Sequence, residues 1–171
     1  MVTTHNDGGV VLWDLRSHTQ TTALGAHDKD ASCCGVLVGG AGEYVVSGGG
    51  DATVRVWDVR GGTTAKRLKG KRGGFEVERV ETESPVMSLA CDSARDGVAS
   101  IGLMNGVMSV YDFSKLEVPE RVGQWTTAND KGITCVRYSP DSSWILTAGI
   151  NGQCAGWHTD SFEKVMERKR S

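Results

Sequence analysis

The sequence predicts an all-β protein built from a repeated unit, and three observations support that prediction. Short runs rich in valine, isoleucine, threonine and aromatic residues alternate with glycine-containing turns along most of the chain. The 171 residues include 23 glycines but only 3 prolines, which suits many tight turns with positive φ angles. An acidic or amide turn residue stands six positions before an aromatic residue at four places. We therefore expect antiparallel strands joined by tight turns, in a unit that recurs about four times.

The clearest copy of the unit spans residues 26–58. Two apolar runs, 31–38 and 44–47, are separated by a glycine-rich segment, and a second glycine turn ends at Asp51. The alternating run 53–58 follows directly. Apolar and alternating runs joined by glycine turns predict three consecutive antiparallel strands.

Aligning the turn residue with its aromatic partner identifies the other copies. The pairs are Asp7 with Trp13, Asp51 with Trp57, Asn105 with Tyr111, and Asn151 with Trp157. The aromatic residues are 44, 54 and 46 positions apart. The residues four positions before the turn residue are Thr3, Ser47, Ile101 and Thr147. A period of ~40–45 residues with four strands per unit is typical of a β-propeller blade.

Three dipeptides resemble the WD-repeat family of β-propellers. They are Trp13-Asp14, Trp57-Asp58 and, in the place of the family's usual Gly-His, Ala26-His27. The resemblance covers nearly the whole chain and is strongest in the second repeat. It weakens in the third repeat, where Ile101 replaces the hydroxyl residue, and in the fourth, where His158 follows Trp157. It implies an all-β WD-repeat β-propeller segment of about three and a half four-stranded blades.

The expected blades occupy approximately residues 1–25, 26–70, 84–126 and 131–169, with an inserted loop at 69–83. We expect the outer strand of the second blade at 64–68. The segment 75–81 alternates apolar and charged residues, which predicts a loop or an extra edge strand between blades.

The number of expected blades is below what most closed rings need, because propellers close with ~4–8 blades. An open arc would leave an apolar blade flank and strand edges uncovered. We therefore expect either a fragment of a longer protein or a second chain that completes the ring.

The resemblance implies a buried hydrogen-bond relay in the second blade. In the family the Trp57 indole would donate to Ser47, Ser47 to His27, and His27 to Asp51. Such a network fixes one packing of the turn on the strand, because buried polar groups must be paired. Partial sets remain in the first blade (Thr3, Asp7, Trp13) and in the fourth (Thr147, Asn151, Trp157). We accordingly expect the third and fourth blades to be less rigid than the second.

Serine, histidine and aspartate also form the hydrolase triad, but a catalytic interpretation is disfavoured. The Ser47 hydroxyl is expected inside the blade against Trp57, and no Gly-x-Ser-x-Gly motif is present. The five cysteines show no Cys-x-x-Cys spacing and are expected to be small buried residues. We expect no catalytic residue, metal site, cofactor or small-molecule substrate.

The expected function is that of a non-enzymatic scaffold that binds other proteins within a multi-protein assembly. Family resemblance places the partner face on the turns before the first strand and between the second and third strands of each blade. The loop residues there are Asn6, Lys29, Asp30, Met104, Lys131 and Ile150. The absence of a visible signal peptide or an apolar run of ~20 residues predicts an intracellular protein of cytoplasm or nucleus.

Two alternatives remain open. Arg16 and Arg60 each follow a Trp-Asp pair by two positions, which resembles substrate receptors of cullin–RING ubiquitin ligases, in which such an arginine contacts the adaptor. The basic runs 66–72 and 168–170 could instead dock RNA in a ribosome-assembly complex. The net charge of −2 argues against a protein built mainly to bind nucleic acid, so that partner is a weak expectation.

Overall fold

The computed structural model describes residues 1–39, 42–59, 76–116, 118–127 and 131–169, which form four antiparallel sheets. The first sheet contains β1 (Val2–Thr4), β2 (Gly9–Asp14) and β3 (Thr19–Ala26). The second contains β4 (Ala31–Gly39), β5 (Gly42–Gly49), β6 (Thr53–Asp58) and β7 (Glu76–Glu81). The third contains β8 (Val86–Cys91), β9 (Val98–Leu103), β10 (Val107–Asp112) and β11 (Glu120–Thr126). The fourth contains β12 (Ile133–Tyr138), β13 (Trp144–Gly149), β14 (Gln153–His158) and β15 (Lys164–Lys169).

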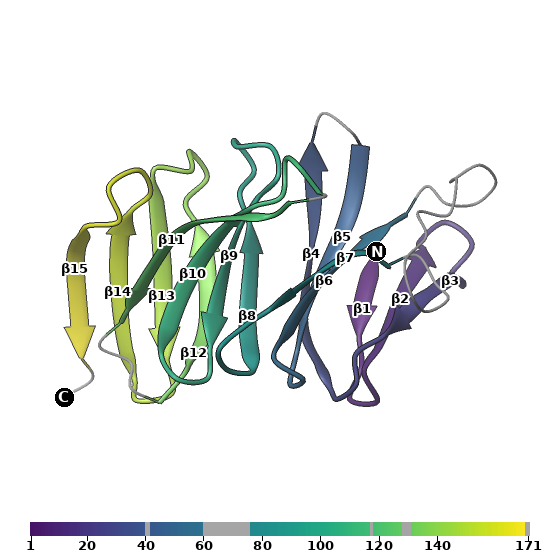
Figure 1. The fold of residues 1–171 in the computed structure, drawn as a ribbon, viewed down its shortest axis with the longest axis horizontal. Helices are drawn as coiled ribbons and strands as arrows, with labels where there is room; N and C mark the ends of the chain where they lie inside the picture. Colours follow the sequence, from purple (N-terminus) through teal and green to yellow (C-terminus); the bar gives the residue numbers. More distant parts are fainter. Residues whose placement is uncertain (40–41, 60–75, 117, 128–130, 170–171) are drawn as a thin grey trace.

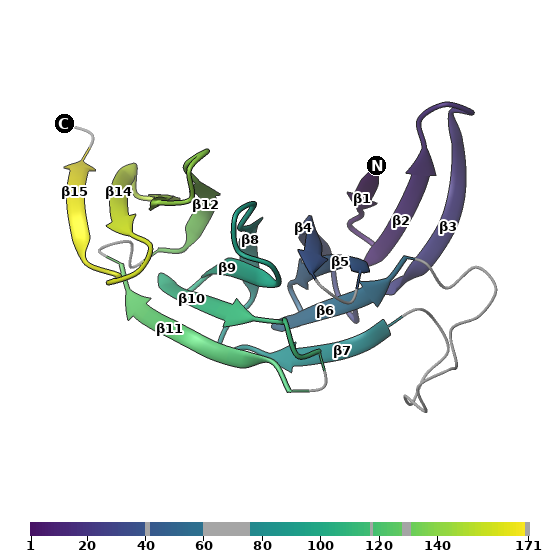
Figure 2. The same cartoon turned by 90° about the horizontal axis from the view of Figure 1, so that it is seen from above.

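Each sheet is a meander whose strands are paired in chain order, and the sheets succeed one another like blades. Figure 1 shows the four sheets side by side along the longest axis of the molecule. Seen from above, they fan into an open arc with β4, β8 and β12 on its inner side and β7 and β11 on its outer side (Figure 2). The expected fold class, a partial WD-type propeller of about three and a half blades, is therefore confirmed. The described part of the chain holds no helix long and apolar enough to cross a membrane.

The outer strand of the second sheet differs from the expectation. β7 pairs with β6 in antiparallel register, with Val54 opposite Val80, and so completes the four-stranded sheet. Residues 76–81, expected as an inserted loop or an extra edge strand, thus occupy the fourth-strand position. The expected strand at 64–68 lies outside the described residues.

Each sheet has two faces, and strand alternation assigns the residues to them. The face toward the next sheet, here called the forward face, carries in the second sheet Tyr44, Val46, Val54 and Val56. The face toward the preceding sheet, here called the rear face, carries Val45, Ser47, Arg55 and Trp57. Side chains from a forward face and the following rear face make three apolar clusters, one between each pair of neighbouring sheets. Burial of these clusters is the main force that holds the arc together.

Glycines on the forward faces let neighbouring sheets approach closely near the innermost strands. A Cβ atom on Gly48 would lie 2.3 Å from Val86 Cγ1, and one on Gly102 would lie 2.7 Å from Ile133 Cγ2. Val86 and Ile133 are each the first residue of the following innermost strand. Both glycines are therefore required by packing against the next sheet.

The turns β1–β2, β5–β6, β9–β10 and β13–β14 share one geometry. In each turn the acidic or amide side chain accepts the backbone N–H two residues later, at 2.9–3.2 Å; these turn residues are Asp7, Asp51, Asn105 and Asn151. The intervening residue has a positive φ in every case: Gly8, Ala52, Gly106 and Gly152. An aspartate or asparagine recurs at this position because its side-chain oxygen can accept a hydrogen bond from the backbone two residues later.

Candidate functional site

The second sheet holds a continuous buried hydrogen-bond network. The indole Nε1–H of Trp57 donates to Ser47 Oγ at 2.8 Å, and His27 Nε2 lies 2.7 Å from the same oxygen. His27 Nδ1 lies 3.0 Å from Asp51 Oδ1. With the Nδ1–H tautomer, Ser47 donates to Nε2 and His27 donates to Asp51, which satisfies every member of the network.

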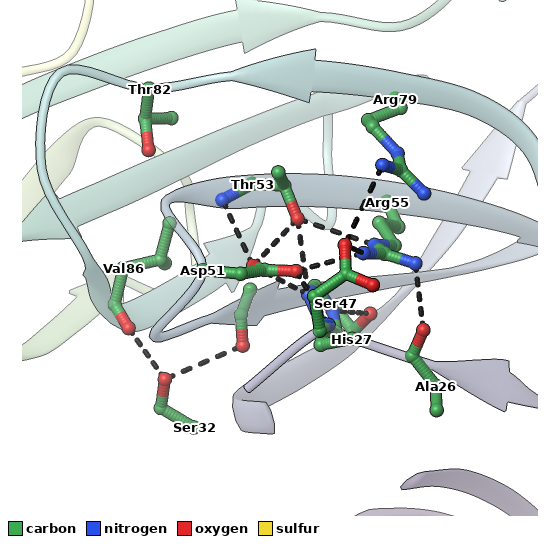
Figure 3. Close-up of polar contacts among 12 residues, drawn as sticks. Ala26, His27, Ser32, Ser47, Asp51, Thr53, Arg55, Arg79, Thr82 and Val86 are labelled. Carbon is green, nitrogen blue, oxygen red and sulfur yellow. Dashed lines mark hydrogen bonds and ion pairs between the residues drawn. The ribbon is translucent and has the colours of Figure 1, made fainter. Parts of the chain in front are cut away.

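Two residues that the sequence analysis did not single out extend the network. The Thr53 hydroxyl donates to Asp51 Oδ1 at 2.7 Å and accepts from Arg55 Nε at 3.2 Å. Arg55 is only 3% exposed, and its guanidinium reaches both Asp51 Oδ2 at 2.8 Å and the carbonyl of Ala26 at 2.7 Å. Figure 3 shows these side chains converging between the ends of the strands. Arg55 therefore ties the second sheet to the end of β3 in the first.

The charge of Arg55 is balanced by several acids. Besides Asp51, its Nη2 lies 2.8 Å from Asp28 Oδ2 and its Nη1 lies 3.3 Å from Glu76 Oε2. Arg79 Nε in turn donates to Glu76 Oε1 at 2.9 Å. A buried guanidinium is tolerated only with such pairing, because an isolated buried charge is costly.

Burial and hydrogen bonding set the protonation states of the network. Burial lowers the pKa of His27, although the hydrogen bond to Asp51 partly opposes this. Burial alone would raise the pKa of Asp51, but hydrogen bonds from the Asp28 N–H, Thr53 and His27 outweigh it and hold that pKa well below its usual range. The network therefore pairs a neutral imidazole with an ionised carboxylate at neutral pH.

The geometry gives the Ser47, His27 and Asp51 set no route to a substrate. Ser47 is fully buried, and its hydroxyl oxygen is already engaged by both Trp57 and His27. A nucleophile must present its oxygen to a reacting carbon beside oxyanion donors. What this arrangement can do is fix the turn after β5 and the segment before β4 in one conformation.

The first and fourth sheets hold shorter versions of the network. Trp13 Nε1 donates to Thr3 Oγ1 at 2.8 Å, and Trp157 Nε1 donates to Thr147 Oγ1 at 3.1 Å. The Thr3 hydroxyl also lies 3.0 Å from Nε2 of His5, an exposed residue of the same sheet. In the third sheet the corresponding residues, Ile101 and Tyr111, are buried in the apolar cluster between the second and third sheets.

Backbone hydrogen bonds identify the residues that take the position of His27 in the connections after the second and third sheets. His27 N–H donates to the carbonyl of Gly8 in the shared turn geometry. The equivalent donors are Thr82, to Ala52, and Thr127, to Gly106. These threonines keep the backbone connection of His27 but have no imidazole. Neither threonine is part of a Gly-His dipeptide, so the sequence motif does not reveal them. Their position one residue after an outer strand does identify them.

The expected partner-face residues lie in turns at one end of the sheets. Asn6, Met104 and Ile150 belong to the turns β1–β2, β9–β10 and β13–β14, at the lower end in Figure 1. Lys29 and Asp30 lie between β3 and β4, and the segment that contains Lys131 leads into β12. All six residues are exposed.

The residues of the two alternatives lie elsewhere. Arg16 is exposed in the β2–β3 turn, at the opposite end of the sheets, where its N–H donates to Asp14 Oδ1 at 2.8 Å. Arg60 and the basic run 66–72 lie outside the described residues, and of the run 168–170 the strand β15 includes Arg168 and Lys169. Of these basic residues, the described structure therefore places only Arg16, Arg168 and Lys169.

The cysteines are less buried than expected. Cys33, Cys34, Cys91 and Cys135 are half-buried, and Cys154 is exposed because it lies on the forward face of the fourth sheet. All five are free thiols, and burial raises the pKa of Cys33 and Cys91 to about 12. Among the described residues, no three histidine, cysteine or acidic side chains gather as a metal site would require.

Comparisons with known proteins agree with this architecture. Residues 18–58 and 120–158 match the WD40 family model, described as WD domain, G-beta repeat. Each match begins at or next to an outer strand and ends with the third strand of the following sheet.

Three curated relatives share limited identity with the chain. Transducin-like enhancer protein 2 of Mus musculus is 22% identical over 97% of this chain, and protein groucho of Drosophila melanogaster is also 22% identical over 97%. Restriction of telomere capping protein 1 of Eremothecium gossypii is 26% identical over 80%. The chain spans only 19%, 20% and 10% of the length of these relatives, respectively. The family-model matches therefore identify WD40 repeats at residues 18–58 and 120–158, and the four blade-like sheets agree with the architecture expected of such repeats.

Proposed function

We propose that this chain is a non-enzymatic scaffold that binds other proteins through the turns at one end of its sheets. The observation that carries the proposal is a pair of exposed apolar side chains at equivalent turn positions. Met104 is 52% exposed in the third sheet and Ile150 is 55% exposed in the fourth. Large apolar side chains at neighbouring loop tips are a common feature of protein-binding surfaces.

Backbone contacts indicate that these two residues belong to one surface. The Gly132 carbonyl accepts the Ile150 N–H at 3.1 Å. On its other side, a Cβ atom on Gly132 would lie only 3.0 Å from the Met104 carbonyl oxygen. Gly132, with a φ of +96°, therefore connects the two turns, and the exposed Lys131 precedes it directly. We call Met104, Lys131 and Ile150 the turn patch.

The composition of the turn patch suggests the chemistry of its ligand. Two apolar side chains beside one lysine suit a peptide segment that presents an apolar anchor and a nearby carboxylate. Lys29 and Asp30, which follow the first sheet at the same end, offer a mixed-charge continuation for a longer segment.

The buried network serves this function indirectly. It joins the turn after β5 to the segment before β4, so the loops of the second sheet are held in one conformation. Preformed loops bind with a smaller loss of conformational entropy, which favours affinity.

The test is a selection of binding peptides followed by affinity measurement. Peptides are selected from a random library on the 171-residue chain, and the dissociation constant of the best peptide is measured by fluorescence anisotropy. The double variant Met104→Glu/Ile150→Glu should bind this peptide at least ~10-fold more weakly, because it removes the apolar anchor site and adds repulsion toward an acidic ligand.

A matched control changes an exposed apolar residue at the opposite end. Val118 lies between β10 and β11 and is exposed, so Val118→Glu should leave the affinity unchanged. All three substituted residues are solvent-exposed, so the melting temperature should stay at the wild-type value. Equal affinity of wild-type chain and double variant would contradict the proposed surface.

The finer assignments follow from the same proposal. We place the chain in an intracellular multi-protein complex of cytoplasm or nucleus, which the five free thiols support. A cullin–RING substrate receptor remains the alternative, and an adaptor pull-down with and without Arg60→Ala decides it. RNA binding in a ribosome-assembly complex would instead appear as an affinity that falls steeply with salt concentration.

A further inference from the structure

One turn position differs in side chain between the second, third and fourth sheets. It is the residue directly before the acid or amide of the turn: Gly50, Met104 and Ile150. In each sheet its backbone N–H donates to the residue that directly precedes the innermost strand. The pairs are Gly50 with Asp30 at 2.8 Å, Met104 with Pro85 at 2.9 Å, and Ile150 with Gly132 at 3.1 Å. The three turns are therefore built alike and differ in what they carry.

In the second sheet, a carboxylate takes the place of the side chain at this position. Gly50 does not have a positive φ, so its backbone conformation does not require glycine. A Cβ atom on Gly50 would lie 2.2 Å from Asp30 Oδ1 and 3.0 Å from Asp30 Cγ. Any other residue at position 50 would therefore displace this carboxylate. The glycine leaves room for an acid where the next two sheets have an apolar side chain.

The Asp30 carboxylate is accessible to a ligand. Asp30 is exposed, and among the described residues no cation forms an ion pair with it. The neighbouring Asp28, in contrast, is already paired with Arg55. The backbone of Lys29 lies toward the first sheet, where a Cβ atom on Gly8 would be 2.4 Å from the Lys29 carbonyl oxygen. A cationic group of a partner can therefore reach Asp30 from solvent.

Together these turns form a row with opposite charges at its two ends. The second, third and fourth sheets follow one another along the arc (Figure 2). The row accordingly runs from Asp30 over Met104 to Ile150 and the exposed Lys131. Stacked sheets lie about 10 Å apart, so neighbouring positions of the row are about three extended residues apart.

We propose that the partner of the turn patch is an extended peptide segment with a lysine or arginine that pairs with Asp30. This basic residue stands about three positions from the apolar anchor at Met104. The inference rests on the proposed function, because it adds a charged subsite to the same surface. A carboxylate of the segment near Lys131 and a cation near Asp30 together favour one orientation of the segment along the arc.

Peptide selection on the wild-type 171-residue chain is the first test. Peptides from a random library should be enriched in lysine or arginine about three positions from an apolar residue. Selection on Asp30→Lys should instead enrich an acidic residue at that place, because the charge of the subsite is reversed.

Affinities of the best wild-type peptide, labelled with fluorescein, provide the second test. Asp30→Asn keeps the shape of the side chain over Gly50 and should weaken binding by about 2–5-fold, the usual effect of one exposed ion pair. Asp30→Lys should weaken binding by at least about 10-fold, because repulsion is added. The same peptide with its basic residue changed to glutamate should bind Asp30→Lys more tightly than it binds the wild-type chain.

Asp96→Lys is the matched control, because Asp96 is an exposed aspartate of the β8–β9 connection at the opposite end of the sheets. It should leave the affinity unchanged, and all variants should melt at the wild-type temperature. Peptides that depend on Met104 and Ile150 but lack the basic residue, or bind Asp30→Lys as tightly as wild type, would overturn this inference alone. A library without binding peptides, or peptides insensitive to Met104→Glu/Ile150→Glu, would contradict the proposed function and this inference with it.

Discussion

The His27 side chain joins three residues of the buried network. Its two ring nitrogens contact Ser47 on one side and Asp51 and Thr53 on the other. Removing the ring leaves the buried Ser47 hydroxyl without its acceptor and takes one hydrogen-bond donor away from Asp51. His27→Ala should therefore lower the free energy of unfolding by about 1–3 kcal/mol, measured by urea denaturation. An unchanged denaturation midpoint would show that the network does not stabilise the fold.

The same residue predicts how stability depends on pH. The folded pKa of His27 lies below the ordinary value of 6.5, so the unfolded chain takes up a proton that the folded chain excludes. Its contribution is therefore complete above about pH 6.5 and is lost as the pH falls through the folded pKa. The groups that face it are Asp51, Arg55 and Glu76, and Asp51, whose pKa is also lowered, adds a further loss below its ordinary value of 3.8.

A titration of unfolding free energy measures this effect. Between pH 6.5 and the folded pKa, the wild-type chain should lose stability with falling pH, whereas His27→Gln should show a shallower slope in that range. Identical slopes would mean that His27 is protonated equally in both states.

The residues of this network differ in how far the sequence could reveal them. Trp57, Ser47 and Asp51 stand at fixed spacings within one repeat, so alignment of the repeats finds them. Arg55 lies in an alternating strand like any solvent-facing arginine. Its burial depends on Asp28, Asp51 and Glu76, which meet only after three segments have folded together. No local pattern encodes that convergence.

At the scale of elements, the turns explain which glycines the fold requires. The positive φ recurs at one turn position, where three sheets use glycine and the second uses Ala52 at φ 58°. A residue with a side chain is strained in this region by ~1–2 kcal/mol. Among the described turns of this kind, only the turn of the second sheet therefore places a residue other than glycine, Ala52, at the positive φ.

Ala52→Gly should stabilise the chain by about 0.5 kcal/mol, because the relief of strain exceeds the added flexibility of the unfolded chain. Thermal denaturation followed by circular dichroism measures the change. The reverse substitution at the equivalent position, Gly106→Ala, should destabilise the chain by about 1 kcal/mol. A lower melting temperature for Ala52→Gly would indicate that the alanine side chain makes a contact that offsets its strain.

The strands themselves were more predictable than the connection between them. The strands β8 to β11 lie at 86–126 and the strands β12 to β15 at 133–169, within the expected blades 84–126 and 131–169. The expected outer strand of the second sheet is 64–68, whereas β7 begins at Glu76. An insertion before a strand shifts its position without changing its pattern, and only pairing with β6 identifies the strand.

At the scale of the whole molecule, the position of a sheet in the arc determines how well it is covered. The second and third sheets are packed on both faces, while the first and fourth each leave one face exposed. In repeat proteins, stability is approximately the sum of each repeat's own stability and its contacts with neighbours. The third sheet lacks the indole–hydroxyl hydrogen bond but buries Ile101 and Tyr111 instead. The exchange rates of its backbone amides therefore show whether packing between sheets or the buried network contributes more to local stability.

Amide hydrogen exchange measured residue by residue distinguishes the contribution of packing between sheets from that of the buried network. If packing on both faces dominates, the amides of β9 and β10 should exchange as slowly as those of β5 and β6, and β2 and β14 should exchange faster. If the buried network dominates, the second sheet alone should be slow. We expect the first outcome, because all six residues of β9 are buried although its sheet lacks the network.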